Sequence, residues 1–218
     1  VIPLIGRSSH AHGIYFTYED WQVNVNKDKN AYLISFPEGI QYKDYPQKYK
    51  EYIEKGEDEE ANTGYKCRIR KRWYIVPSIW VPDAFLLRRN NTFPKFVLNN
   101  INAVSTDTMH RIKFNEGVNR DKVLLSYYNS VSFAFTEING RSYGGGVLEI
   151  LPGEASNIML PDLSEFSLEE TQRLLALVDN TIRNNDNIEN ILDIIDKQLL
   201  IDYLGIDKEV CNEFIDIW

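Results

Sequence analysis

A short stretch of the sequence combines closely spaced cations with aromatic rings, a combination suited to nucleic acid. Five basic side chains lie within seven residues, and Trp73 and Tyr74 follow them directly. The five are Lys66, Arg68, Arg70, Lys71 and Arg72. Because alternate side chains of a β-strand share one face, a strand over residues 65–74 would align four of these cations in a ridge that neutralises phosphates. The two rings could then stack on an extruded base.

Two structural interpretations of the same residues stay open. The cations could form surface ion pairs with the acidic flanks, which contribute little stability, and the aromatic rings could belong to the core. Binding is favoured by other basic and amide side chains in the same region, since arginine pairs with guanine and asparagine with adenine. These residues are Arg88, Arg89, Lys95, Asn99, Arg111, Asn119, Arg120 and Asn129.

The charge is distributed unevenly along the 218 residues. The net charge of −8 argues against a nucleic-acid partner, but it is an average over the chain. Residues 1–63 carry seven basic and eleven acidic side chains, residues 64–141 carry thirteen and five, and residues 142–218 carry four and sixteen. A positive central block between acidic ends indicates a surface that binds a polyanion.

The composition predicts a folded, soluble protein of the cytoplasm. Apolar residues make up 43% of the chain, enough to build a core and to exclude the disordered classes. No apolar run approaches the ~20 residues of a membrane span, and no signal segment opens the chain. Cys67 and Cys211 are too few for a disulfide framework, which favours a reducing compartment. Because the chain begins at Val1 without a methionine, we expect a fragment of a longer protein.

No catalytic, cofactor-binding or metal-binding residues are expected in this chain. His10, His12 and His110 have no further ligand at metal-binding spacing, so surface or turn positions are favoured for them. The common nucleophile, phosphate-loop and dinucleotide motifs are lacking. The glycines at 144–146 precede a predicted strand rather than a helix, so they indicate a close backbone approach or an unusual turn.

Apolar periodicity predicts both helices and strands as the elements that position these residues. Strands are predicted over residues 31–36, 73–76, 79–81, 84–87, 96–98 and 147–150. Helices are predicted over residues 44–56 and 120–139. In the acidic last fifty residues, Ser167 with Glu170 and Asp186 with Glu189 predict capping boxes that open two more helices. A third helix is expected from Asp207, and the whole tail is interpreted as a packing appendage.

The glycine-rich segment at residues 140–155 reads Gly-Arg-Ser-Tyr-Gly-Gly-Gly-Val-Leu-Glu-Ile-Leu-Pro-Gly-Glu-Ala, and Leu160-Pro161 follows it. This segment resembles the end of the target-recognition region of N6-adenine DNA methyltransferases of restriction-modification systems. Residues 65–77, 119–120 and 128–137 are similar to preceding parts of that region. The resemblance implies an α+β, β-rich target-recognition domain over residues 1–163, with residues 164–218 as an acidic helical appendage. Arg141 and Tyr143, in the glycine-rich segment, complete the expected DNA-binding residues.

The resemblance implies a specificity domain that contacts double-stranded DNA and helps to hold an extruded adenine for a separate catalytic domain of the parent chain. The family's Asn/Asp-Pro-Pro-Tyr/Phe motif is absent, because no two prolines are adjacent. The glycine-rich cofactor motif is missing too, so S-adenosylmethionine is expected to bind elsewhere in the parent protein, and this chain alone is not expected to be catalytic. The alternative function is docking of a restriction-modification partner subunit through the acidic helices.

Overall fold

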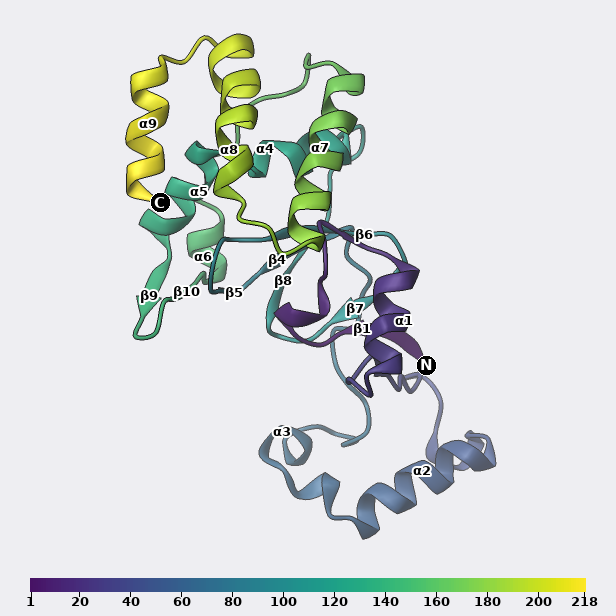
Figure 1. Cartoon of the computed structure of the whole chain (residues 1–218). Coiled ribbons are helices and arrows are strands. Elements are labelled where there is room, and N and C mark those ends of the chain that lie inside the picture. Colours follow the sequence, from purple (N-terminus) through teal and green to yellow (C-terminus); the bar gives the residue numbers. More distant parts are fainter. The chain divides into compact units, whose positions relative to one another are not determined.

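The computed structural model describes residues 1–218 and divides them into two units (Figure 1). The smaller unit consists of residues 1–2 and 32–80, and the larger unit of residues 3–31 and 81–218. The chain therefore leaves the larger unit after residue 31 and returns to it at residue 81.

A mixed four-stranded sheet forms the centre of the larger unit. β4 (Ala84–Leu87) is antiparallel to both β6 (Phe96–Asn99) and β8 (Met109–Ile112), and β2 (Tyr15–Phe16) pairs in parallel with β6. The strand order is β2-β6-β4-β8. The strands predicted over 84–87 and 96–98 are thereby confirmed.

Alternate residues of β4 enter two different cores. Ala84 and Leu86 belong to the apolar cluster shared with the C-terminal helices, whereas Phe85 and Leu87 belong to a second cluster with Trp21 of α1 (Tyr18–Asn26). Successive side chains of a strand point to opposite faces of its sheet. Both faces of β4 are therefore buried, which explains why this short strand contains no polar residue.

Two helices replace the single helix predicted over residues 120–139. α4 (Arg120–Tyr127) ends before Asn129, and α5 (Ser130–Asn139) begins directly after it. The buried Asn129 accepts a hydrogen bond from the Ser132 amide at 3.0 Å and donates one to the Ser126 carbonyl at 2.6 Å. It caps α5 and fixes the break, because its side chain satisfies backbone groups that a continuous helix would pair.

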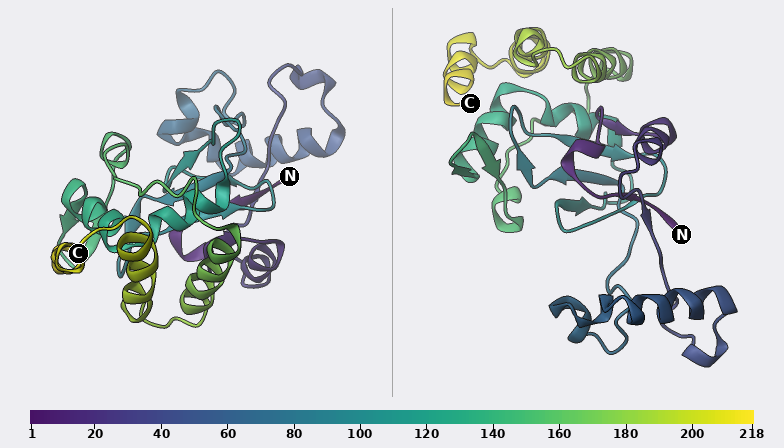
Figure 2. Two further views of the ribbon diagram at one scale, coloured as in Figure 1. Left: turned by 90° about the horizontal axis from the view of Figure 1, so that it is seen from above. Right: turned by 60° about the horizontal axis from the view of Figure 1, so that its bottom comes forward.

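The C-terminal helices pack on the larger unit's own core. Figure 2 shows α7 (Leu168–Arg183), α8 (Glu189–Asp196) and α9 (Lys208–Ile217) following one another in a row. A π-helix over Lys197–Tyr203 extends α8, and Gly205 follows it with a φ of +71°. Apolar residues of α7 and α8 share one cluster with residues of β4, β6 and α4. Apolar residues of the tail are thus part of this core.

One of the two predicted capping boxes has formed its serine cap. The Ser167 hydroxyl accepts a hydrogen bond from the Glu170 amide at 3.4 Å and caps α7. The box expected between Asp186 and Glu189 is wrong, because the Asn187 carboxamide accepts the Glu189 amide instead, at 3.1 Å.

Short strands complete the larger unit. β5 (Arg89–Asn90), β10 (Val147–Glu149) and β9 (Arg141–Tyr143) form an antiparallel sheet in that order. β1 (Ile2–Ile5) and β7 (Val104–Ser105) pair in parallel through Leu4 and Val104. A 3₁₀ turn lies at Ser8–His10, and the one-turn helix α6 covers Pro152–Ala155.

The smaller unit is held together by aromatic side chains. Its elements are β3 (Tyr32–Leu33), α2 (Gln47–Asp58), α3 (Tyr65–Arg68) and 3₁₀ turns at Tyr42–Asp44 and Ala61–Thr63. Phe36, Tyr45, Ile53, Tyr74 and Ile75 form its buried core. α2 continues past Gly56, whose position against the ring of Trp73 leaves no room for a side chain: an added Cβ would lie 2.3 Å from the ring.

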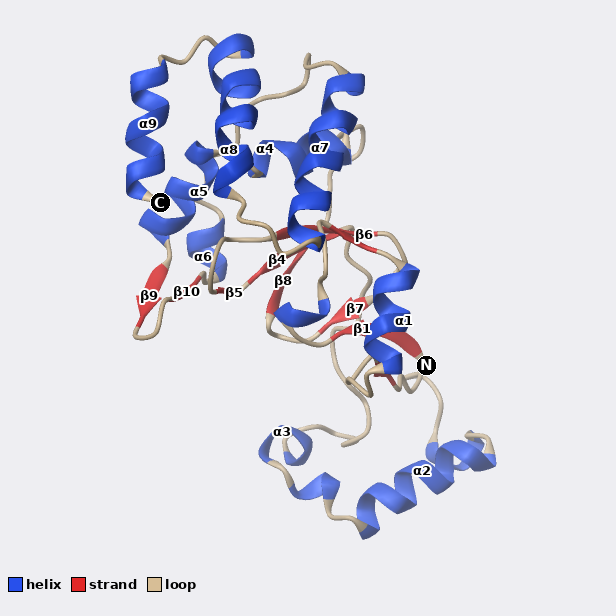
Figure 3. Cartoon of the chain, in the orientation of Figure 1, coloured by secondary structure: helices blue, strands red, loops and turns tan.

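Helices and strands together confirm the α+β class (Figure 3). The predicted strand over 31–36 shrinks to Tyr32–Leu33, and those over 73–76 and 79–81 do not form. None of the helices is both long and apolar enough to cross a membrane.

Candidate nucleic-acid interface

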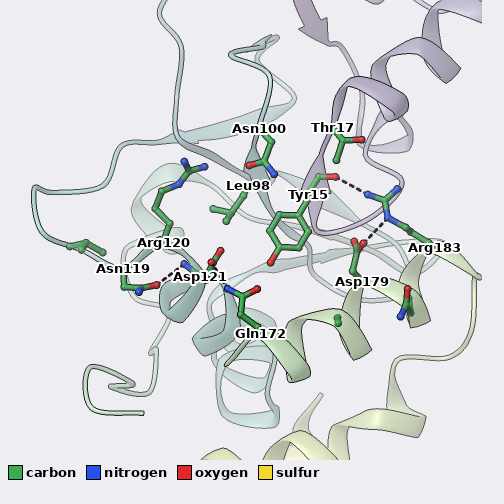
Figure 4. Close-up of a pocket in the computed structure, with 13 residues that line it drawn as sticks. Tyr15, Thr17, Leu98, Asn100, Asn119, Arg120, Asp121, Gln172, Asp179 and Arg183 are labelled. Carbon is green, nitrogen blue, oxygen red and sulfur yellow. Dashed lines mark hydrogen bonds and ion pairs between the residues drawn. The ribbon is translucent and has the colours of Figure 1, made fainter. Parts of the chain in front are cut away.

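A polar hollow of about 760 Å³ lies in the larger unit between β2, the end of β6, and the helices α4 and α7 (Figure 4). The residues that line it are Tyr15, Thr17, Leu98, Asn100, Val118, Asn119, Arg120, Asp121, Gln172, Ala176, Asp179, Asn180 and Arg183. Two of them, Asn119 and Arg120, were expected to bind DNA. Asn119 lies there because it caps α4, accepting the amides of Asp121 and Lys122 at 3.1 Å each.

An ion network forms one side of the hollow. The Arg183 guanidinium donates to Asp20 at 2.7 Å and to Asp179 at 2.7 Å, and Asp179 also accepts the Ile14 amide at 2.8 Å. Burial opposes ionisation of Asp20, but hydrogen bonds from Arg183 and the Thr17 amide outweigh it and lower the pKa of this carboxyl. The two carboxylates thus fix the position of the Arg183 side chain at this side of the hollow.

Tyr15 extends toward the middle of the hollow between Asp121 and Asp179 (Figure 4). Burial raises the pKa of its hydroxyl well above the usual value, and the two carboxylates add to the shift. The phenol therefore stays protonated at neutral pH and offers a hydrogen-bond donor. Gln172 occupies the neighbouring wall, where its amide donates to Asp121 at 2.7 Å.

The hollow also offers groups that nucleic-acid bases could use. The exposed Arg120 makes only long contacts, from Nη2 to the carbonyls of Asp83 at 3.4 Å and Asn99 at 3.5 Å. The carboxamides of Asn100 and Asn180 are exposed and form no hydrogen bond within the chain. Guanidinium and carboxamide groups are the side chains that pair with guanine and adenine edges.

A second polar surface is the outward face of the β5-β10-β9 sheet. Glu149 on β10 is opposite Arg89 on β5 and Arg141 on β9. It contacts Nε of Arg88 at 3.0 Å and of Arg89 at 3.1 Å, while Nε of Arg141 donates to Glu154 at 2.6 Å. We call Arg89, Arg141, Tyr143 and Glu149 the arginine face.

Both carboxyls of this surface have lowered pKa values. Burial opposes ionisation of Glu149, but hydrogen bonds from Tyr143 and Arg89 prevail and lower its pKa. The Leu151 amide, followed by Arg141, lowers the pKa of Glu154 despite some burial. The two carboxylates are therefore ionised at neutral pH and orient the arginines.

The predicted cationic ridge at residues 65–74 is wrong as a strand. Residues 65–68 form the short helix α3, and bends and turns follow. The Arg72 guanidinium donates to the carbonyls of Glu38 and Ile40, and Arg70 donates to the Trp73 carbonyl at 3.2 Å. These two arginines hold the fold of the smaller unit, whereas Arg68 and Lys71 are exposed and have no ion-pair partner.

Trp73 and Tyr74, at the end of the same stretch, are structural. Tyr74 is buried against Phe36 and Tyr45. Trp73 is half-buried, and its Nε1 donates to Glu57 at 3.1 Å. The interpretation that these rings belong to a core therefore describes them better than base stacking.

Three other expected DNA-binding residues serve the fold. The buried Asn99 donates to the carbonyls of Pro82 and Ala103 at 2.8 and 2.9 Å, and Asn129 caps α5. Lys95 is partly buried, donates to the Ala11 carbonyl at 3.2 Å and lies 5.5 Å from the ring centre of Phe93. Because their polar groups are engaged within the fold, these side chains are not available to contact bases.

Of the other expected residues, Lys66 is exposed on α3 and Arg111 is half-buried on β8. Both make contacts within the chain. Exposed Arg120 lines the hollow, and Arg141 and Tyr143 lie on the arginine face. The expected residues therefore reach the surface in several separate places rather than in one ridge.

Sequence reasoning missed several residues of the hollow, including Tyr15, Gln172, Asp179 and Arg183. Asp179 and Arg183 are spaced i,i+4 and border the buried stripe of α7, so their ion pair could have been predicted from the sequence. Their link to Asp20, 163 positions away from Arg183, has no local signal.

Residues 1–200 match the family model described as "Type II methyltransferase M.Eco57I, C-terminal domain". The chain is also similar to "Type II methyltransferase M.AccI" of Acinetobacter calcoaceticus, with 24% identity over 210 residues. That alignment covers 93% of this chain and 38% of the relative, so the chain spans well under half the length of the curated protein it matches.

Proposed function

The chain belongs to the family of the M.Eco57I-type methyltransferase C-terminal domain, and from this premise we propose that it recognises the DNA target of a site-specific methyltransferase. The methylated atom in this proposal is N6 of adenine, as the glycine-rich segment at 140–155 suggests by resemblance. Methyl transfer and S-adenosylmethionine binding belong to a separate catalytic domain of a longer parent protein that acts on chromosomal DNA in the cytoplasm.

The observation that carries the proposal is the convergence, in the hollow, of polar side chains that make only long hydrogen bonds or none within the chain. Arg120, Asn100 and Asn180 come from α4, from the residue after β6 and from α7, yet all line one cavity. Groups that pair with base edges rather than only with phosphates supply sequence discrimination. Arg183, Asp179 and Asp20 hold the wall beside them rigid, and rigid support is what a reading site needs.

The residues at hand do not fit S-adenosylmethionine at their most glycine-rich point. Gly144, Gly145 and Gly146 lie in a β-hairpin, are exposed, and have no atom within 4 Å of a Cβ placed on any of them. A cofactor cradle would surround such positions. We accordingly propose that the parent protein binds the cofactor outside this segment.

Selection from a random pool of duplexes tests the proposal directly. The 218-residue chain is mixed with duplexes that carry a randomised centre, and the bound fraction is sequenced. We expect one short motif to be enriched, and the double variant Asn100→Ala, Arg120→Ala to lose that enrichment while its circular dichroism stays unchanged. Arg173→Ala, an exposed arginine of α7 outside the hollow, is the matched control. Binding without any preferred motif would contradict target recognition.

The docking alternative is not favoured. The apolar stripes of α7 and α8 lie in the chain's own core, and the Phe133 ring of α5 lies 5.0 Å from that of Trp218, just after α9. These helices therefore need no partner subunit to cover their apolar residues.

A further inference from the structure

We propose that the arginine face reads guanine in the major groove of the target DNA, with Arg89 and Arg141 as the reading side chains. This inference rests on the proposed function and names the surface and the base that serve it. Its ligand is a duplex edge that carries the paired acceptors O6 and N7.

The register of the sheet puts the two arginines on the same side. Arg89 and Arg141 are both opposite Glu149, one on each neighbouring strand, and Tyr143 lies two residues from Arg141 on the same face. Leu148 and Asn90 point to the other face and are both buried. The arginine face is therefore the solvent side of this sheet, and its two arginines are about 10 Å apart across three strands.

Two carboxylates each contact one of these arginines along one edge of its guanidinium group. The contact to Arg89 comes from Glu149 and that to Arg141 from Glu154, and each engages Nε. The side chains of Glu149 and Glu154 are only 6% and 18% exposed, whereas those of Arg89 and Arg141 are 68% and 58% exposed. The carboxylates thus lie beneath the arginines and orient them from below.

The terminal nitrogens of both arginines remain available. No contact within the chain engages Nη1 or Nη2 of Arg89 or Arg141, so two oriented guanidinium ends are presented to solvent. A guanidinium binds the O6 and N7 acceptors of guanine in a bidentate manner, the commonest specific contact in the major groove. Orientation before binding reduces the entropy that is lost on forming such a contact.

The shape of the hairpin also suits a groove. β10 pairs with β5 only at Leu148 and Glu149, so the turn end of the β9-β10 hairpin is two-stranded, and this end projects from the larger unit in Figure 1. The major groove admits a two-stranded ribbon. Gly145 and Gly146 have φ values of +91° and +73°. The turn therefore requires a backbone conformation that favours glycine at both positions. Gly144 has neither a positive φ nor a neighbour within 4 Å, so nothing inside the chain requires glycine there. A narrow tip at this position would allow close approach to DNA.

Base reading and phosphate binding make different predictions for a change of arginine to lysine. Lysine keeps the charge but loses the planar fork. We expect Arg89→Lys and Arg141→Lys each to weaken binding of the enriched duplex by about tenfold, with the salt dependence of the affinity unchanged. Arg173→Lys, whose guanidinium pairs with the exposed Glu170 on α7, should bind as the wild type does.

Replacement of single guanines by 7-deazaguanine supplies the second arm of the experiment, because it removes N7 and preserves base pairing. The wild type should lose about tenfold in affinity when 7-deazaguanine replaces one or two particular guanines. Arg141→Lys or Arg89→Lys should show no further loss at the guanine that the replaced arginine contacts. Fluorescence anisotropy with the 218-residue chain measures all the affinities.

The outcomes separate this inference from the proposed function. A wild type that enriches no motif overturns both. A wild type that enriches a motif, but whose lysine variants bind equally well, overturns the guanine assignment alone. If a lysine variant melts below the assay temperature, the 7-deazaguanine scan of the wild type decides, and insensitivity at every guanine overturns the assignment.

Discussion

Arg183 near the C-terminal end of α7 donates to Asp20 in the first turn of α1, with Nη1 and Oδ1 2.7 Å apart. The same guanidinium binds Asp179 through Nε at 2.7 Å. Gly13 passes so close to this pair that an added Cβ would lie 2.2 Å from Asp179 Oδ1. Ion pairs of Arg183 thus link the N-terminal segment to α7 at one side of the hollow.

Loss of Arg183 should destabilise the larger unit. Arg183→Met leaves two partly buried carboxylates without their cation, and removal of one partner of a buried ion pair costs about 3 kcal/mol. Urea unfolding followed by circular dichroism measures the free energy of unfolding. Arg173→Ala breaks an exposed pair with Glu170 and should cost under about 1 kcal/mol. Equal stability of the two variants would contradict a structural role for Arg183.

Acid should weaken the larger unit through His10. Its ring is buried and accepts the Gly6 amide at 3.2 Å, and burial, followed by Lys29 and Arg7, lowers its pKa from 6.5 to about 4. Because the folded state favours the neutral ring, this stabilisation is fully present above pH 6.5 and is lost as the pH falls toward 4. One proton contributes a slope of up to about 1.4 kcal/mol per pH unit.

His10→Asn keeps an acceptor for the Gly6 amide but does not titrate. The free energy of unfolding of the variant should therefore fall less steeply than that of the wild type between pH 6.5 and 4.5, in chemical denaturation at each pH. Parallel curves for the two proteins would show that His10 does not titrate on unfolding.

A methyl group at position 56 should destabilise the smaller unit. Glycine to alanine inside a helix normally gains up to about 1 kcal/mol, but here the added carbon meets the ring of Trp73. Overpacking costs about 1 to 3 kcal/mol, so we expect a net loss for Gly56→Ala, with a shift in tryptophan emission. Gly153→Ala has open space around it and is the control. A stabilised Gly56→Ala would mean that Trp73 moves aside freely.

Two exposed cations of the smaller unit should contribute to the salt dependence of DNA binding. If Arg68 and Lys71 each contact a phosphate, the double variant Arg68→Glu, Lys71→Glu should lower the slope of log affinity against log salt by about 1.8 or more. Lys48→Glu reverses an exposed lysine of α2 in the same unit and should change the slope little. An unchanged slope in the double variant would remove this segment from the interface.

Features specified by neighbouring residues could be predicted from the sequence. The cap of α7 needs only Ser167 and an amide three positions on. The strands predicted over 84–87 and 96–98 follow from short apolar runs, and the second extends by one residue to Asn99. The α+β class follows from these elements. Their recognition requires no knowledge of what packs against them.

Features decided by distant partners could not be predicted in this way. The alternation of cations with Cys67 and Ile69 imitates a strand, yet no strand pairs with it, and Ile69 stays 67% exposed. The carbonyls that bind Arg72 come from residues 38 and 40, which only the folded loop brings near. The hollow depends in the same way on contacts between α7 and the first twenty residues.

The ion pair between Asp20 and Arg183 also bears on which segments of the chain could be exchanged between relatives. Residues 3–31 and 164–218 contribute to one folded unit, so a crossover near residue 163 would join halves whose cores and ion pairs have not been selected together. The segment 32–80 has its own aromatic core. Exchange of that segment between relatives would leave the Asp20–Arg183 pair and both apolar clusters of the larger unit in place.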